Sequence, residues 1–388
     1  MAAGRSAAVL SPREINRATL SRQLLLDRTV LPAGEPGEVR AAAVLQAIEH
    51  LVGLQAQAPF PPYYGLQSRL DGFRPDDLAA LITSRGVVRI ALMRGTIHLI
   101  SARDCLPLRR LVQPAVERGI RSGAFGRQLA GVDLGELAAA GRTLVESAPM
   151  TFSQLGLALA TRWPDRPPAA LAQGVRAFVP LVQVPPRAVW GQAGQSLHTS
   201  AEHWLGQPAE PARPASPAES AGLVTRYLGA FGPATVRDVQ AWSGLTGLRA
   251  VMEKLRPSLV TFRDEHGAEL FDLPAAPRPG GDAPAPARLV AEFDNLVLSH
   301  ADRSRVISAE NAKRLYTVNG VIPGSVLIDG FVAGMWRLTR SKDLTTVTIE
   351  VFGPMRERAA LEREAERVLA FCSPDAPHDI RFAPLVPA

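Results

Sequence analysis

Two glutamines, Gln55 and Gln57, interrupt an otherwise apolar pattern and are the first candidates for chemistry. Apolar residues recur at helical spacing before them, at positions 44, 48 and 51, and Gln55 comes next on that face of a helix expected over Val39–Gln57. A buried amide without a partner costs about 1–3 kcal/mol. Either backbone or water satisfies Gln55, or the helix face opens onto a ligand there.

The spacing of the pair leaves two interpretations open. Side chains two residues apart on a regular helix point to different sides. Pro59, Pro61 and Pro62 are expected to end the helix just after Gln57, and at an unwound helix end the two amides could converge. The pair is then either a set of capping or solvated glutamines, or a site whose carbonyl oxygens orient a water molecule.

The elements around the pair belong to a repeated pattern. Pro149-Met150-Thr151 and Pro233-Ala234-Thr235 each begin a Pro-x-Thr-apolar-x-polar-apolar stretch, and each threonine can cap a helix with Gln154 or Asp238 as its reciprocal partner. Helices are expected before these stretches (134–147 and 222–231) and after them (168–178 and 248–256). Short β-like runs follow at 181–184, 188–190, 259–263 and 269–273. Three helices and a hairpin are the plan of a winged helix.

The N-terminal third fits the same plan, with a helix over 74–84 and a hairpin of Val87–Met93 and Thr96–Ser101. We therefore predict a mainly α fold with small β-hairpins (α+β). It consists of three tandem winged-helix units, residues 1–130, 131–205 and 219–273, and a C-terminal α+β segment, residues 288–388. Strands are expected at 288–299, at 325–338 with a hairpin turn over Ile328–Phe331, and at 345–352, with a helix over 355–371. The Pro/Ala-rich stretches 206–218 and 274–287 are expected to be linkers or long loops.

Composition limits the class of protein. The net charge of +6 permits a polyanionic partner, and only three of the 43 basic residues are lysine. Arginine forks suit phosphates, although codon bias in a GC-rich genome explains the same excess. Two distant cysteines, no apolar run long enough for a membrane and no signal peptide predict a cytoplasmic protein without membrane contact. Dispersed histidines and the lack of a Gly-rich phosphate motif predict neither a metal nor a cofactor.

The stretch from Leu51 to Pro59 resembles the Gln-x-Gln active-site motif of the winged-helix DNA glycosylases of the AlkZ/YcaQ-like family (HTH_42 superfamily). The stretches Met93–Leu99, Phe293–Arg303 and Val326–Gly330 are similar to this family as well, in the same order along the chain. Glutamine at position 57, where a related branch has aspartate, indicates the Gln-x-Gln branch. The resemblance implies a C-shaped arrangement of the winged helices around DNA.

The resemblance also implies an activity. This branch removes N7-alkylguanine, including bulky natural-product adducts and interstrand crosslinks, so the expected partner is double-stranded DNA carrying alkylated guanine, bound by a monomer. Gln57 is assigned to hold the attacking water, and Gln55 to orient it or to contact the sugar. Since no lysine lies near the pair in sequence, we expect hydrolysis without lyase activity.

Several further residues are candidates for DNA contact, each with a structural alternative. The arginines could pair with phosphate or with carboxylates, the histidine could be a satisfied strand residue, and the tryptophan could pack in the core. The candidates are Arg69, Arg94, His98, Arg303, Arg305, Trp336 and Arg337. Two other classes remain open: a non-catalytic winged-helix transcriptional regulator and a protein-interaction scaffold.

Overall fold

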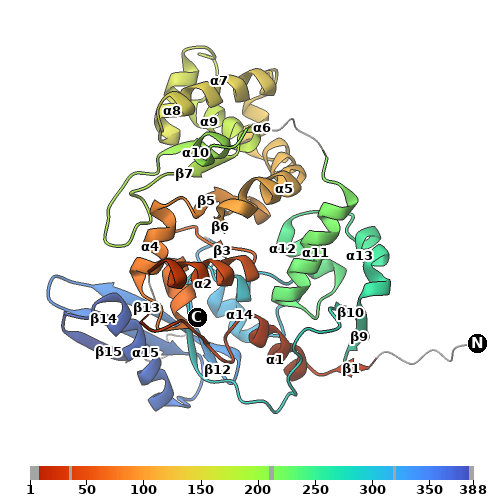
Figure 1. Cartoon of the computed structure of the whole chain (residues 1–388), viewed down its shortest axis with the longest axis vertical. Helices are drawn as coiled ribbons and strands as arrows, with labels where there is room; N and C mark the ends of the chain where they lie inside the picture. Colours follow the sequence, from red (N-terminus) through yellow and green to blue (C-terminus); the bar gives the residue numbers. More distant parts are fainter. Residues whose placement is uncertain (1–7, 35–36, 209–213, 318–319, 384–388) are drawn as a thin grey trace, which may run out of the picture.

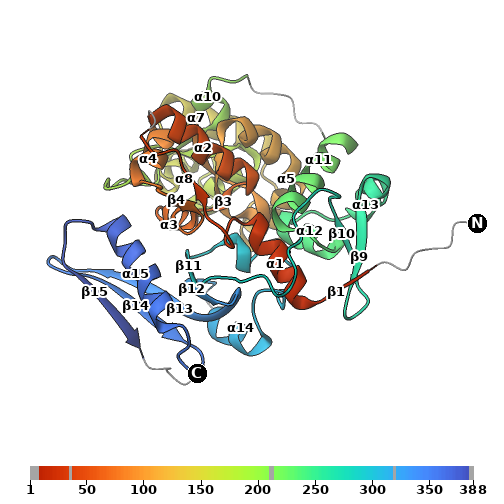
Figure 2. The ribbon, with the colours of Figure 1, turned by 60° about the horizontal axis from the view of Figure 1, so that its bottom comes forward.

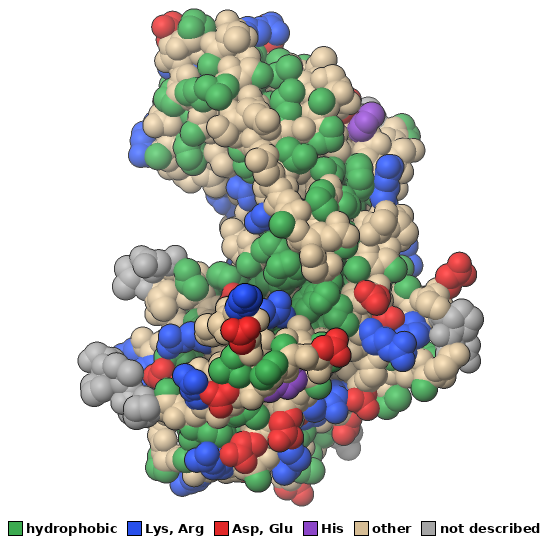
Figure 3. Space-filling view, turned by 90° about the vertical axis from the view of Figure 1, so that its left-hand side faces the viewer, with side chains coloured by type: hydrophobic (Ala, Val, Ile, Leu, Met, Phe, Trp, Pro, Cys, Tyr) green, Lys and Arg blue, Asp and Glu red, His purple; other side chains and the backbone are tan. Residues whose placement is uncertain are grey.

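The computed structural model describes residues 8–34, 37–208, 214–317 and 320–383, which form two lobes on either side of a central sheet (Figure 1). Helices α6–α10 lie in the upper lobe, and most of the remaining chain lies in the lower one. A space-filling view shows that the molecule is hollowed between the lobes (Figure 3). The mixed α and β fold predicted above is confirmed. Within the described ranges no helix is long and apolar enough to span a bilayer.

The central sheet has five strands in the order β3-β6-β5-β7-β8, and each neighbouring pair is antiparallel. Strands β5 and β6 are the predicted hairpin, joined through a short 3-10 turn, η1 (Met93–Gly95). The strands are β3 (Leu54–Gln55), β5 (Val87–Ala91), β6 (Ile97–Ser101), β7 (Leu181–Gln183) and β8 (His198–Ser200).

The strand predicted over residues 188–190 is wrong. Pro185 and Pro186 lack the N–H groups that would continue the ladder after β7. Ala188 and its neighbour instead pack into the core beside the first hairpin, where the Tyr63 hydroxyl donates to the Ala188 carbonyl at 2.8 Å. Strand β8 pairs with β7 in their place. Strands from the first two predicted units therefore share one sheet, and the division of the chain into separate units remains a prediction.

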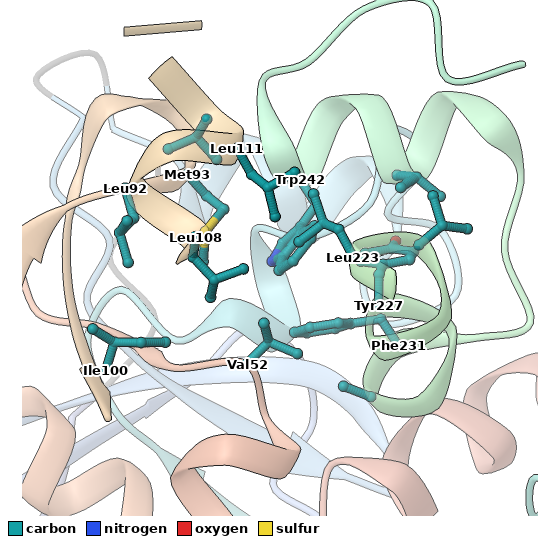
Figure 4. Close-up of a cluster of buried hydrophobic side chains, with 14 of the residues drawn as sticks. Val52, Leu92, Met93, Ile100, Leu108, Leu111, Leu223, Tyr227, Phe231 and Trp242 are labelled. Carbon is teal, nitrogen blue, oxygen red and sulfur yellow. The ribbon is translucent and has the colours of Figure 1, made fainter. Parts of the chain in front are cut away.

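Alternation along the strands gives the central sheet two buried faces. Leu99 points toward helices α2 and α4, whereas Ile100 points toward α5, α11 and α12. On the second face, Trp242 and Tyr227 pack close to Leu108 and Val52 (Figure 4). The helices of the N-terminal part are α2 (Gly37–His50), α3 (Pro61–Gln67), α4 (Pro75–Thr83), α5 (Ala102–Ser122) and α6 (Ala124–Gln128).

Two groups of three helices confirm the helical part of the repeat seen in the sequence. The Thr151 hydroxyl accepts from the backbone N–H of Gln154 at 3.2 Å, and the Thr235 hydroxyl accepts from the backbone N–H of Asp238 at 3.1 Å. Each pair forms a reciprocal capping box. The helices are α7 (Leu134–Ser147), α8 (Phe152–Ala160) and α9 (Pro168–Phe178), then α11 (Pro217–Phe231), α12 (Val236–Ser243) and α13 (Arg249–Leu255). Helix α10 (Ala201–Leu205) follows β8.

The second group of helices is followed by the predicted hairpin, β9 (Val260–Asp264) and β10 (Glu269–Asp272), after a short turn, η2 (Arg256–Ser258). Strand β1 (Val9–Leu10) adds to β9 in parallel. The N-terminal residues of the described chain therefore complete a sheet formed some 250 residues later.

The C-terminal segment is a five-stranded sheet with helix α15 on it (Figure 2). A turn at Asp329 and Gly330, both with positive φ, joins β12 to β13 as predicted. The strand predicted over 288–299 is too long, because Phe293 turns left-handed and Asp294 caps a 3-10 turn. The elements are β11 (Arg288–Val290), η3 (Asn295–Val297), α14 (Ala309–Leu315), β12 (Gly324–Ile328), β13 (Phe331–Arg340), β14 (Thr345–Val351), α15 (Arg358–Cys372) and β15 (His378–Ala383).

Helix α1 (Pro12–Arg22) lies between the C-terminal sheet and the hairpin of β9 and β10 (Figure 2). At its start, Arg13 forms an ion pair of 2.6 Å with Asp329 of the β12–β13 turn. At its end, Arg22 forms a buried ion pair of 2.6 Å with Asp272 of β10. A two-stranded sheet of β2 (Thr29–Val30) and β4 (Leu70–Asp71) follows.

Candidate active site

Gln55 ends the short strand β3 and Gln57 lies in the bend that follows it, so the helix predicted to run through Gln57 is wrong. Helix α2 ends at His50, and the chain then turns through two residues of positive φ, Val52 and Gly53. A Cβ at Gly53 would lie 2.9 Å from the Leu99 carbonyl oxygen, so only glycine allows this close approach. Both glutamines lie beside strand β6, since Gln55 pairs with His98 and the Gln57 side chain reaches the backbone of Ile97.

Gln55 is 7% exposed, and an arginine holds its carbonyl oxygen. The Arg94 guanidinium donates to the Gln55 Oε1 atom at 2.7 Å, to the Asn295 Oδ1 atom at 3.2 Å and to the Trp242 carbonyl at 2.9 Å. The Asn295 amide in turn donates to the Gly53 carbonyl at 3.2 Å, just before β3. Arg94 takes one of the two lone pairs of the Gln55 carbonyl, and no described residue accepts from its Nε2 group, so the Nε2 hydrogens are left to offer a ligand.

The backbone at Arg94 is in the left-handed region, with φ 58°, in the turn between β5 and β6. This conformation is uncommon for a residue other than glycine. Burial and the charge of Arg303 lower the pKa of Arg94 to about 10. The side chain therefore keeps its positive charge at neutral pH, and the surroundings of Gln55 are cationic.

Gln57, in contrast, is exposed. Its Oε1 atom accepts a hydrogen bond of 3.2 Å from the Ile97 backbone N–H. A carbonyl oxygen has two lone pairs, so the same atom can accept a second hydrogen from water. The Gln57 Nε2 group makes no hydrogen bond with any residue that the structure describes.

The prediction that His98 contacts DNA is wrong, because its side chain is 0% exposed. His98 lies directly opposite Gln55 in the β3–β6 pair. Burial and the charge of Arg94 lower its pKa to about 3, so the ring is neutral. The Thr96 carbonyl, 3.0 Å from Nδ1, can only accept, which places the hydrogen on Nδ1.

Three other predicted DNA contacts are also interior and are wrong for the same reason. Arg69 is 1% exposed and forms two hydrogen bonds of 2.8 Å with Asp294. Arg305 is buried, with its guanidinium on the Pro233 carbonyl at 2.7 Å. Trp336 is buried and donates from its indole nitrogen to the Val290 carbonyl at 2.8 Å. Each of these polar groups is already paired inside the protein.

Besides Arg94, two predicted contacts remain accessible. Arg337 is exposed on β13, 3.5 Å from Glu350. Arg303 is half-buried, with its guanidinium 4.5 Å from the centre of the Tyr316 ring, and it lies close enough to Arg94 to lower the pKa of that residue.

Sequence reasoning missed two further arginines beside the site. A cavity of about 610 Å³ adjoins the β5–β6 turn and is lined by Arg94, Arg118 of α5 and Arg176 of α9. Arg118 is exposed and donates to the Gly244 carbonyl at 2.5 Å, whereas Arg176 donates to the Gly95 carbonyl at 3.1 Å. Lys and Arg side chains are visible along the edge of the hollow between the lobes (Figure 3). No local motif marks the two arginines, because only the packing of α5 and α9 brings them to the turn.

Comparison with known proteins agrees with this architecture. The family model described as "DNA glycosylase AlkZ-like" matches residues 48–371. The solved structure of the Streptomyces sahachiroi DNA glycosylase AlkZ superposes with a TM-score of 0.75 at 19% sequence identity, over 97% of this chain and 100% of that one. No curated protein matches the chain. The family model covers Gln55 and Gln57, the β5–β6 turn with Arg94, and Asn295, and it confirms the resemblance inferred from the sequence. The chain belongs to the AlkZ-like DNA glycosylase family.

Proposed function

We propose that this DNA glycosylase hydrolyses the bond between deoxyribose and guanine bases alkylated at N7, acting as a monomer on double-stranded DNA. One observation carries the proposal. Gln55 pairs with His98 of β6 and Gln57 accepts from Ile97 of the same strand, the carbonyl of Gln55 is held by Arg94, and Gln57 is exposed.

The chemistry needs no strong base. Alkylation at N7 gives guanine a positive charge, so the electron pair of the breaking C1′–N9 bond moves to N9 and leaves the base neutral. The sugar becomes an oxocarbenium-like cation. The oxygen of a water molecule then bonds to C1′, and its proton passes to solvent. The Gln57 carbonyl holds this water, and its fixed dipole faces the developing positive charge.

Gln55 is proposed to bind the substrate, whereas Gln57 holds the water. Its carbonyl oxygen is bonded to Arg94, so it offers the Nε2 hydrogens to an oxygen of the sugar or of the adjoining phosphate. Such a contact places C1′ opposite the water on Gln57. The cationic surroundings of Gln55 suit the phosphate side of the nucleotide, and the sugar cation lies on the side of Gln57.

The exposure of Gln57 supports a wide substrate range. A base joined to both strands, or carrying a bulky natural product, cannot easily turn out of the duplex into a closed pocket. An exposed catalytic amide can reach such a lesion in place, so bulky adducts and interstrand crosslinks are included in the proposal. Arg94, Arg118, Arg303 and Arg337 are the proposed phosphate contacts.

We infer a purely hydrolytic reaction. A lyase step needs an amine that forms a Schiff base with the sugar. The three lysines, Lys254, Lys313 and Lys342, are exposed on α13, on α14 and between β13 and β14, and none makes a described contact with residues 53–58.

The test is base release from duplex DNA that contains N7-methylguanine. Wild type should release the free base, and Gln57→Ala should lose most of this activity and still bind DNA. Gln46→Ala, a change at an exposed glutamine of α2, is the matched control and should behave as wild type. Full base release by Gln57→Ala with normal DNA binding would overturn the assignment. Tight binding to one DNA sequence without base release by wild type would favour the transcriptional regulator.

A further inference from the structure

A second cavity, of about 360 Å³, opens immediately after the glutamine strand. One wall comes from the loop that follows Gln57 and from α3, with Phe60 and Tyr64. The other comes from the C-terminal sheet, with Trp336 and Leu338 of β13. The cavity is within the size range of small-molecule sites. It therefore joins the candidate active site to a part of the chain that is distant in sequence.

The aromatic wall is fixed by its surroundings. The Tyr64 ring lies edge-on to Trp336 at 5.9 Å and to Trp190 at 6.0 Å. Arg340 donates to the Tyr64 hydroxyl at 3.3 Å and to the Cys372 carbonyl at 3.0 Å. A wall that is already ordered loses little conformational freedom when a ligand binds.

The polar atoms of this wall are already paired. The Trp336 indole N–H donates to the Val290 carbonyl, and the Tyr64 hydroxyl accepts from Arg340. Against this aromatic wall a flipped guanine would leave its hydrogen-bonding edge without partners, at a cost of about 1–3 kcal/mol per group. A planar apolar group would instead gain contact with the aromatic edges.

The mouth of the cavity carries one unpaired negative charge. Glu292 is exposed and makes no hydrogen bond or ion pair with any residue that the structure describes. Of the neighbouring arginines, Arg340 is held by Tyr64 and Cys372, and Arg337 is exposed, 3.5 Å from Glu350. A carboxylate left free at this place can pair with a cation that approaches from outside.

We propose that this cavity receives the aromatic part of a bulky substituent carried on guanine N7, while Glu292 faces the positive charge of the alkylated base. The inference rests on the proposed function and extends it to the recognition of the adduct. The phosphate of the lesion then lies toward Arg94, and its cationic base lies toward the Glu292 carboxylate.

The test compares two duplex substrates, one with N7-methylguanine and one with a guanine that bears a naphthylmethyl group at N7. Leu338→Trp fills the cavity and should lower kcat/KM for the naphthyl adduct by roughly tenfold or more, in the range that pocket shape alone achieves. The same variant should leave the N7-methyl substrate within about twofold of wild type, as for a change remote from the chemistry. Leu157→Trp, at an exposed leucine of α8, is the matched control and should change neither value.

Glu292→Gln tests the charge separately. It should lower kcat/KM for both cationic substrates by roughly fivefold, the upper range for an exposed ion pair. Glu292→Asp should restore part of the loss. Equal rates in Glu292→Gln and wild type would overturn the role of the carboxylate.

These measurements distinguish a failure of the cavity to bind the adduct from a failure of the proposed function. If wild type releases N7-methylguanine but Leu338→Trp treats both substrates as wild type does, or slows both equally, the cavity does not bind the adduct and the proposed function stands. If wild type releases neither base, the proposed function itself is wrong. Should Leu338→Trp fail to fold by circular dichroism, Leu338→Phe is the second variant, with the same expected selectivity.

Discussion

The Arg94 guanidinium donates a 2.7 Å hydrogen bond to the side-chain carbonyl of Gln55, and the same guanidinium reaches Asn295. Because this bond holds the carbonyl toward Arg94, it sets the orientation in which the Gln55 amide meets a substrate. Arg94→Met should lower the single-turnover rate of base release by about tenfold to a hundredfold, since an unpaired buried amide costs about 1–3 kcal/mol.

For Arg94, the expected signature is a loss in rate larger than the loss in DNA affinity. Arg249→Met, at an exposed arginine of α13, is the matched control and should retain the rate. If Arg94→Met lowered affinity but kept the rate at saturating enzyme, Arg94 would be only a phosphate contact.

Arg69 should matter for stability and not for DNA binding. Arg69→Leu leaves Asp294 buried without its partner, which is expected to cost about 3–5 kcal/mol. Urea unfolding should show this loss, while the folded fraction binds duplex DNA as wild type does. A fall in DNA affinity with unchanged unfolding free energy would contradict the structural assignment.

Arg118 should show the opposite behaviour, because it is exposed beside the arginine turn. Arg118→Ala should keep the unfolding free energy and weaken binding to all DNA sequences alike. The slope of log affinity against log salt should become shallower by about 0.9, the value for one phosphate contact. Arg263→Ala, at an exposed arginine of β9, serves as the control, and an unchanged slope in Arg118→Ala would exclude the contact.

Acid should destabilise the fold well above the pKa values of its carboxylates. Burial lowers the pKa of His98 to about 3, of His198 to about 4 and of His300 to about 3. As the pH falls through the ordinary histidine value near 6.5, the unfolded chain gains protons that the folded chain does not bind.

Each of the three histidines should then remove up to about 1.4 kcal/mol of stability per pH unit, down to its own folded pKa. Unfolding free energies measured from neutral pH downward report this slope, and His300→Gln should make it shallower. Equal stability at about pH 7.5 and about pH 5 would contradict the buried neutral state.

Borohydride should trap no covalent adduct between this protein and DNA. No lysine lies at the glutamine strand, so the expected product of the reaction is an intact abasic site. Gel analysis of the protein with alkylated duplex and borohydride checks this, with a lysine-dependent lyase as the positive control. A trapped band would show that an amine reaches C1′.

Local sequence patterns were sufficient to predict many of the helices and strands. Thr151 and Thr235 each have their capping partner three residues on, and the hairpin around Arg94-Gly95 follows from alternation and a turn glycine. The end of α2 was missed, although Gly53 carries a signal for it, since glycine often follows a helix C-terminus. The apolar spacing up to position 51 suggested that the helix continued, and this placed Gln55 on the wrong element.

The environment of the pair could not be predicted, because its partners are distant in the chain. Asn295 follows Arg94 by 201 residues, and Asp294 follows Arg69 by 225. An arginine that pairs with a buried carboxylate looks the same in sequence as one that faces phosphate. The assignment of Arg69 and Arg305 to DNA was wrong on this account.

The pairing of β5 with β7, through Arg89 with Gln183 and Ile90 with Val182, limits how this enzyme could be recombined with its relatives. A deletion of residues 131–205 would leave β5 as an open sheet edge, and an exchange would make β5 pair with strands of another protein in place of β7 and β8. The upper lobe therefore cannot be exchanged between relatives as an independent unit. A chimera with an altered substrate range has to take the β5–β6 hairpin, β3 and the upper lobe together from one parent protein.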